Sequence, residues 1–176
     1  MIDVVLLLTD DYNNLNKILA SLSLQINKEF KVIILDSIKE AGYENTINLF
    51  KEKLDINYEI TNEKDFKKLM LMAINKSTSK YIMFINEFDV LYDIYSIKNL
   101  TKDINDQLIV EGKVIDKNDN EIKNSIYGKI ISSDYLRNNS EKLDDILELS
   151  DKNNIICKFD LDNLKKIEET IYMKLQ

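Results

Sequence analysis

The first 95 residues alternate between two hydrophobic periodicities, and this alternation limits the possible folds more than any other feature of the chain. Strands buried on both faces are predicted at 4–8, 31–36 and 81–85 from the continuous apolar runs 4–8, 32–35 and 81–85, and a half-exposed alternating strand is predicted at 56–60. Apolar residues recur at helical spacing between these strands, at 15–22, 43–54 and 66–74. A strand–helix repeat predicts a mostly parallel central sheet with right-handed crossovers. We therefore expect an α/β, Rossmann-like, three-layer domain.

The second half, 96–176, is less regular. It predicts a helix at 95–104, a strand at 107–116, a turn at 117–120 and a further strand at 121–131. Ser133 or Asp134 is expected to cap a short helix, followed by a helix at 144–149 and a strand at 155–159. Asp160 is expected to cap a final helix, whose stripe is Leu161, Leu164, Ile167, Ile171 and Leu175. The chain has no internal repeat and no Gly/Ser/Pro linker, which predicts a single domain over 1–176.

Polar side chains follow the predicted parallel strands at their carboxyl ends. They are Thr9, Asp10 and Asp11 after the first strand, Asp36 and Ser37 after the second, and Asn86, Glu87 and Asp89 after the fourth. In open α/β sheets, ligands bind in the crevice outside these strand ends. The sequence therefore places a candidate site at this edge.

Composition excludes several chemistries. Without histidine there is no imidazole base, no Ser-His or Cys-His couple and no histidine-ligated zinc. The single cysteine permits neither an internal disulfide nor a thiolate cluster, and the three isolated glycines form no phosphate-binding loop. A net charge of -7 argues against a nucleic-acid partner.

No segment has the pattern of a signal peptide or a membrane span. The N-terminal apolar run at 4–8 ends at Thr9, far short of the ~20 residues that a spanning helix needs. We therefore expect a cytoplasmic protein, or part of a virion-like assembly.

Four segments of the first 95 residues, in order and at matching spacing, resemble family 2 glycosyltransferases, and a fifth lies farther on. Residues 4–13 resemble the opening strand and its Pro-x-Tyr-Asn turn, and 20–25 the "LxSLLxQ" helix end. Residues 30–37 are similar to the "FEIIVVDDGS" strand, and 80–89 to the "GEYIxFLDxDD" strand that carries the metal-binding motif. Residues 127–136 resemble a "GKLFxRxFL" stretch. The resemblance implies a GT-A fold, in which 1–95 is the nucleotide-binding half and 96–176 the acceptor-side half.

The resemblance also implies a set of site residues, of which this chain keeps only part. Thr9, Asp11 and Asp36 correspond to nucleotide-binding positions, although Thr9 replaces a proline. The two metal-motif aspartates fall on Asn86 and Phe88, and the "ARNxG" element falls on the apolar residues 69–73. The metal motif is therefore degenerate, because only the trailing acid, Asp89, is kept.

A one-residue slip offers an alternative metal pair, Glu87 and Asp89, because carboxylates at i and i+2 of an extended chain point to one side. These two could hold Mg²⁺ or Mn²⁺ through oxygen ligands. The base motif has no clear counterpart, and Glu148 or Asp151 is the nearest candidate.

Two hypotheses for function follow. The first, which the lost motifs favour, is a pseudoenzyme without a cofactor that serves as a structural or interaction subunit with other protein subunits, for example in a phage-tail-like particle. The second is an active glycosyltransferase that binds a nucleotide sugar through Mg²⁺ or Mn²⁺ on Glu87 and Asp89.

Overall fold

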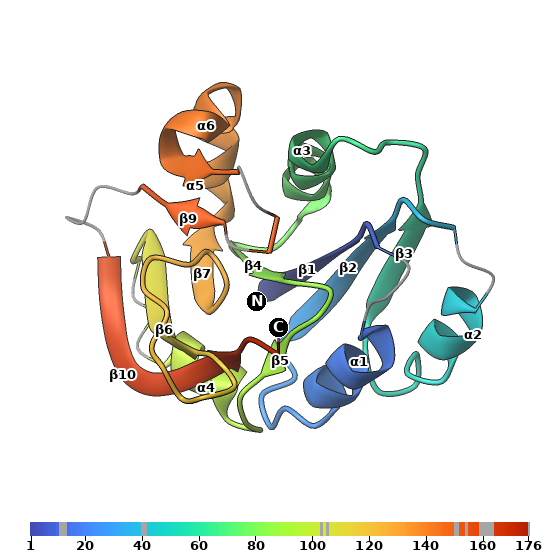
Figure 1. Ribbon diagram of the computed structural model, residues 1–176, viewed down its shortest axis with the longest axis horizontal. Coiled ribbons are helices and arrows are strands. Elements are labelled where there is room, and N and C mark those ends of the chain that lie inside the picture. The colour runs from blue at the N-terminus through green and yellow to red at the C-terminus, as the bar shows by residue number, and fades with distance from the viewer. Residues whose placement is uncertain are drawn as a thin grey trace.

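A computed structural model describes residues 1–10, 14–39, 42–102, 104, 106–149, 152–153, 155–158 and 164–175. Within these residues the chain forms an eight-stranded sheet of order β3-β2-β1-β4-β7-β6-β10-β5 and a separate two-stranded sheet, β8-β9. The large sheet takes strands from both halves of the sequence and curls on itself, as the bent β10 in Figure 1 shows.

The elements predicted for the first half are confirmed, although the helix expected at 43–54 ends at Asn48. The strands are β1 (Ile2–Leu8), β2 (Phe30–Asp36), β3 (Ile56–Ile60) and β4 (Tyr81–Ile85), and the helices are α1 (Leu15–Ser23), α2 (Tyr43–Asn48) and α3 (Phe66–Lys76). Neighbouring strands β3, β2, β1 and β4 are all parallel, as the strand–helix repeat requires. Every residue of β1 and β4 is buried, which explains the unbroken apolar runs at 4–8 and 81–85.

Helices cover both faces of this parallel part of the sheet. In Figure 1, α1 and α2 lie on one side of β1–β3 and α3 lies on the other, which gives the expected three layers. The apolar stripe of α1 is buried against the sheet, with Leu15, Ile18, Leu19 and Leu22 all at most 3% exposed. Among the described residues the longest helix, α3, has 11 residues, and no helix has the apolar length needed to cross a bilayer.

The second half adds strands to the sheet beyond β4. Strand β5 (Val90–Leu91) ends the first half, and the strands of the second half are β6 (Ile109–Ile115), β7 (Lys129–Ser132), β8 (Leu147–Glu148), β9 (Ile156–Cys157) and β10 (Leu164–Met173). Its helices are α4 (Ser96–Thr101), α5 (Ser133–Asn138), the 3₁₀ turn Ser140–Lys142 and α6 (Leu143–Ile146). Strand β7 joins the halves because it pairs antiparallel with both β4 and β6.

The predicted final helix is wrong, because residues 164–173 form strand β10. This strand pairs in parallel with β6 and antiparallel with β5, with register shifts between Lys166 and Tyr172. Pairing with β6 buries Ile171 and Tyr172 completely, a gain that an isolated helix would not give. The β-branched residues of the segment also suit a strand. Asp160 and Leu161 lie outside the described residues.

Three further boundaries differ from the prediction. The strand expected at 121–131 is reduced to isolated bridges at Glu121 and Ser125 followed by β7, because Asn124 and Gly128 have positive φ angles of 59° and 83° that turn the chain. The helix expected at 144–149 ends at Ile146 and continues as β8. The cap of α5 is Ser132, whose hydroxyl accepts a hydrogen bond from the Tyr135 amide.

Candidate functional site

The carboxyl ends of β1, β2 and β4 lie at one edge of the sheet, as predicted. Two of the predicted site residues, Thr9 after β1 and Glu87 after β4, are in direct contact there. Asp36 ends β2 at the same edge. The other acid of the proposed metal pair, Asp89, has different partners, described below.

Glu87 is a buried carboxylate whose two oxygens both accept hydrogen bonds. Its Oε2 accepts from the backbone amides of Thr9 (2.8 Å) and Asp10 (3.0 Å). Its Oε1 accepts from the Thr9 hydroxyl (2.6 Å) and from the Lys152 ammonium (3.0 Å). The Glu87 side chain is only 3% exposed. It therefore fixes the turn after β1 to the end of β4.

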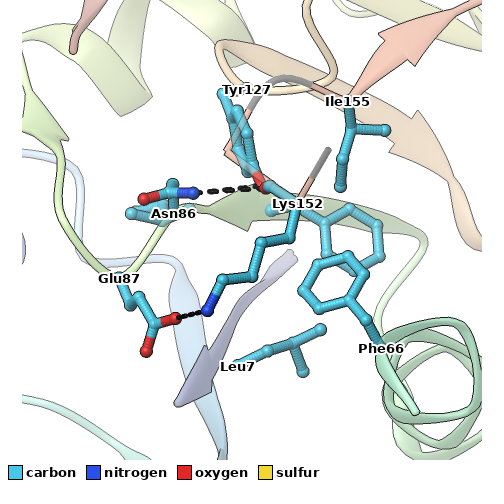
Figure 2. A pocket seen from close by; sticks show the side chains of 9 residues that line it. Leu7, Phe66, Asn86, Glu87, Tyr127, Lys152 and Ile155 are labelled. Atoms are coloured by element: carbon cyan, nitrogen blue, oxygen red, sulfur yellow. Dashed lines mark hydrogen bonds and ion pairs between the residues drawn. The ribbon is translucent and has the colours of Figure 1, made fainter. Parts of the chain in front are cut away.

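Lys152 completes this arrangement from the far end of the sequence. Its Nζ lies 3.0 Å from Glu87 Oε1, 2.7 Å from Thr9 Oγ1 and 3.9 Å from Asp10 Oδ2, and Figure 2 shows the side chain reaching across the strand ends to Glu87. Sequence reasoning missed this residue, because a lysine in a polar turn gives no signal of its partner. We call the contact between Lys152 and Glu87 the lysine clamp.

The backbone at Lys152 is held by side chains that lie next to β4 and β7. Asn86 Nδ2 donates to the Lys152 carbonyl (3.3 Å) and to Asn153 Oδ1 (3.1 Å), and the Tyr127 hydroxyl also donates to the Lys152 carbonyl. The ring of Tyr127 stacks on that of Tyr172 with centroids 5.7 Å apart. The segment at 152–153 is therefore anchored by backbone contacts as well as by the ammonium.

A pocket lies beside the lysine clamp but has very little free space. Figure 2 shows its apolar wall facing the Lys152 stem. The residues that line it are Leu7, Phe66, Phe84, Ile85, Asn86, Glu87, Tyr127, Lys152 and Ile155. Its volume is about 10 Å³, room for about one water molecule. A nucleotide sugar would have to displace Lys152 to enter here.

Asp89 is also buried, but its hydrogen-bond donors are not those of Glu87. Its Oδ1 accepts from the Leu175 amide (3.0 Å) and its Oδ2 from the Tyr172 hydroxyl (3.3 Å). Burial raises the pKa of the Asp89 carboxyl, and it outweighs the lowering by the Leu175 amide, the nearby Lys174 ammonium and the Tyr172 hydroxyl. Asp89 thus connects the end of β4 to the end of β10.

Asp36 organises the loop that follows its own strand. Its Oδ1 accepts from the amides of Ile38 and Lys39 (both 2.8 Å), and its Oδ2 accepts from the Tyr58 hydroxyl (2.6 Å). Burial raises the pKa of Tyr58, and the hydrogen bond to Asp36 adds to this effect. The Asp36 residue is fully buried. Its role as a nucleotide-binding residue stays a prediction, since all of these contacts are structural.

The candidate bases are not brought to the pocket by any described contact. Glu148 lies on β8 and is exposed, with its Oε2 3.9 Å from Lys158 Nζ, and it does not line the pocket. Asp151, like the nucleotide-binding candidate Asp11, lies outside the described residues.

The donor set at this edge does not fit a divalent metal as it is arranged. Both oxygens of Glu87 already accept hydrogen bonds, and one faces an ammonium that repels a cation. Glu87 and Asp89 accept their hydrogen bonds from different donors, and the described part of the chain contains no cluster of three acidic, histidine or cysteine side chains that could hold a metal. Metal binding by this pair stays a prediction that requires Glu87 to leave its partners.

Known structures are similar to the whole described fold. The crystal structure of residues 1–349 of S. aureus TarS aligns with a TM-score of 0.77 at 14% identity, covering 99% of this chain and 60% of that one. TarS in complex with UDP-GlcNAc gives 0.78 at 13% identity, over 99% and 58%. The mannosyltransferase PcManGT from Pyrobaculum calidifontis, in complex with GDP-Man and Mn²⁺, gives 0.67 at 10% identity, over 98% and 56%.

These similarities are structural only. No protein-family model and no curated protein matches the chain by sequence. The chain spans about three fifths of the length of the TarS and PcManGT structures. Identities of 10–14% establish the fold alone. The resemblance to family 2 glycosyltransferases is therefore confirmed at the level of architecture, and this chain has the α/β GT-A fold of those enzymes.

Proposed function

We propose that this GT-A domain does not catalyse glycosyl transfer and serves as a structural or interaction subunit. The observation that carries the proposal is the lysine clamp. Glu87 is the acid nearest to the expected metal motif. Both of its carboxylate oxygens accept hydrogen bonds, from Thr9, Asp10 and Lys152. The carboxylate thus holds the protein together at the place where a metal-dependent transferase needs a free ligand.

The energetics favour the lysine clamp over binding of a metal by Glu87. A buried carboxylate that loses its donors leaves several polar groups unpaired, each costing about 1–3 kcal/mol. The free energy of metal binding at Glu87 would have to exceed this cost. Few oxygen ligands remain to provide it, because Asn86 and Phe88 replace the two aspartates expected there. The side-chain amide of Asn86 also donates a hydrogen bond to the Lys152 carbonyl. Asn86, which stands where an aspartate is expected, thus stabilises the position of Lys152.

The competing function is an active glycosyltransferase. Its support is the fold, together with structures of that fold that contain UDP-GlcNAc or GDP-Man and Mn²⁺. On this alternative, Lys152 swings away, Glu87 and Asp89 bind Mg²⁺ or Mn²⁺, and a nucleotide sugar occupies the widened pocket.

Calorimetric titration separates the two proposals. The protein is titrated with UDP-GlcNAc and with GDP-mannose, each with and without Mn²⁺, and the Lys152→Met variant, which removes the ammonium, is titrated in parallel. We expect no metal-dependent heat for the natural sequence. For the variant we also expect none, because deleting the lysine restores no missing aspartate.

The controls keep the result interpretable. Glu87→Gln and Asp89→Asn keep the side-chain shape but remove the charge that a metal needs. Binding that requires Mn²⁺ and disappears in both variants would show the enzyme hypothesis to be right. Binding that is unchanged in both would place the nucleotide elsewhere. A hydrolysis or transfer assay with the same donors then checks turnover directly.

A further inference from the structure

Five large hydrophobic side chains gather on two loops at the end of α1 farthest from the lysine clamp. Leu24 and Ile26 follow α1, and Tyr92, Ile94 and Tyr95 lie between β5 and α4. Each of the five is between 41% and 64% exposed. Both loops lie along the lower edge of Figure 1. We call these five residues the loop patch.

The two loops are fastened to each other, so the loop patch is a preformed surface. The Ile26 amide donates to the Ile94 carbonyl (3.0 Å). The buried side chain of Gln25 donates to the Asp93 carbonyl (2.6 Å) and accepts from the Ile97 amide (3.0 Å). A surface held in this way loses little conformational entropy when a partner docks.

The area of the loop patch suits a protein interface. If a fully exposed side chain of this size offers about 200 Å², the five residues expose on the order of 500 Å² of mostly apolar surface. A standard interface buries about 800 Å² per partner, of which somewhat more than half is apolar. The two tyrosines belong to the residue type that most often dominates binding energy at such interfaces.

Three exposed lysines lie on the segments that carry the loop patch. Lys28, Lys98 and Lys102 are all exposed, and Lys98 Nζ lies 5.9 Å from the centre of the Tyr95 ring. The end of α4 is held beside the first loop by the hydrogen bond from Asn27 to Thr101 (3.1 Å).

Two acids share these segments but do not reverse the sign of the local charge. The Asp93 carboxylate is used within its own turn, where it accepts from the Tyr95 amide (2.8 Å) and the Ser96 hydroxyl (3.2 Å). Glu29 is the other acid, and it is exposed. Residues 24–29 and 92–102 thus contain three lysines and two acids, on a chain whose net charge is -7.

We infer that the loop patch docks a partner protein whose contact surface has an aliphatic centre and a rim of Asp and Glu. Charge complementarity selects this occupant, because acidic groups around an apolar centre would meet the three lysines. A second copy in a symmetric dimer would set the same lysines against each other. An anionic membrane would repel the net negative chain. The inference rests on the proposed interaction role and gives that role a surface.

A defined probe tests the inference. The probe is a fluorescent amphipathic helical peptide with a leucine stripe flanked by glutamates, and its matched control has lysines in place of the glutamates. We expect saturable binding of the glutamate peptide, at least about tenfold tighter than the lysine peptide. The double variant Tyr92→Ala/Tyr95→Ala should weaken binding at least about tenfold, and Lys98→Glu/Lys102→Glu about three- to tenfold with a smaller salt dependence.

Matched control variants separate a surface effect from general damage. Leu49→Ala/Ile60→Ala removes two hydrophobic side chains that are exposed outside the loop patch, at 75% and 54%. Lys117→Glu/Lys123→Glu makes the same charge change on exposed lysines of the second half. Both should bind the peptide like the natural sequence, and thermal unfolding checks that every variant is folded.

Four results would overturn the inference. These are no binding of the glutamate peptide, equal binding of both peptides, a dimer in solution that the tyrosine variant dissociates, and preferential binding to phosphatidylserine vesicles. Nucleotide-sugar titration of the tyrosine variant is run alongside. If the peptide does not bind and no metal-dependent sugar binding is found, the proposed function still stands. A failure of the inference is therefore distinguishable from a failure of the proposed function.

Discussion

The two ends of the β1–β4 strand pair each contain a buried carboxylate, and the two are used in related but different ways. At the amino end, Asp3 accepts four hydrogen bonds from the turn at 77–79, through the hydroxyls of Ser77 and Ser79 and the amides of Thr78 and Ser79, at 2.7–3.0 Å. At the carboxyl end, Glu87 also accepts four, but one comes from the Lys152 ammonium.

The comparison bears on function. No ligand crevice is expected at the amino end of parallel strands, so Asp3 is a purely structural carboxylate. Glu87 lies where a ligand is expected, yet its oxygens are used just as completely as those of Asp3. The difference is Lys152, which brings a distant segment over the strand ends. At both ends of the strand pair, the carboxylate oxygens therefore accept hydrogen bonds from the protein itself.

The largest expected effect is at Asp3. Replacing it with Ala leaves two hydroxyls and two amides without their acceptor, and we expect a loss of about 4 kcal/mol in the free energy of unfolding. Urea unfolding measures it. The control Asp55→Ala removes a carboxylate whose side chain is 67% exposed and lies 3.9 Å from Lys31, and should change stability by less than about 0.5 kcal/mol. A loss at Asp3 no larger than at Asp55 would refute the structural assignment.

Glu87→Ala should cost somewhat less, about 3 kcal/mol, because Lys152 is 31% exposed and water can solvate the ammonium that remains. Lys152→Met alone should cost about 1 kcal/mol, since Thr9 and Asp10 still hold Glu87. The double variant Glu87→Ala/Lys152→Met should lose clearly less stability than the sum of the two single losses, because the two side chains contact each other. Asp3→Ala combined with Lys152→Met should be additive, since the two sites lie at opposite ends of β1, about 20 Å apart.

The pH dependence of stability should have opposite signs at Asp3 and Asp89. Burial alone would raise the pKa of Asp3, but the hydrogen bonds from Ser79, Ser77 and Thr78 outweigh it and lower the pKa below 3.8. The stabilisation by Asp3 is therefore full above about pH 4 and is lost as the pH falls through the folded-state pKa. Asp89 has a raised pKa, so it favours the folded state most below about pH 4, and this contribution is lost as the pH rises through the folded-state pKa.

Urea midpoints of the natural sequence, Asp3→Asn and Asp89→Asn, measured from pH 3 to 8, test these signs. The stability deficit of Asp3→Asn should shrink as the pH falls below 4. Asp89→Asn should be as stable as the natural sequence or more stable at pH 7, and should lose this relative advantage in acid. Curves of the same sign for both positions would contradict the assignment.

The smallest effect concerns the thiol of Cys157, which lies on β9, five residues after Lys152. Burial raises the pKa of this thiol to about 12, so at pH 8 it should react with a disulfide reagent far more slowly in the folded protein than in urea. Lys152→Met should speed the reaction several-fold by loosening the segment, while Lys67→Met, at an exposed pair with Asp144, should not. Equal rates in both variants would show that the lysine clamp does not control local opening.

Periodicity predicted the first half well because it is a local signal that burial reinforces. The apolar run at 4–8 and the stripe of α1 were sufficient to place β1 and α1, since each is buried as its pattern requires. The helix predicted from the stripe at 164–171 is wrong, because burial there does not follow the local pattern. Its spacing fits a helix, but β6 offers a strand pairing that buries Ile171 and Tyr172, and tertiary contact outweighed the pattern.

The sequence by itself determined the strand–helix order, the parallel half of the sheet and the edge at which Thr9, Asp36 and Glu87 lie. Topology alone fixes that edge, because parallel strands all end on the same side. Only the tertiary structure decided what these side chains do there. The partner of Glu87 is 65 residues away, at Lys152, and no local spacing encodes such a contact. A carboxylate ready for a metal and one committed to a lysine have the same sequence pattern, and their neighbours in space distinguish them.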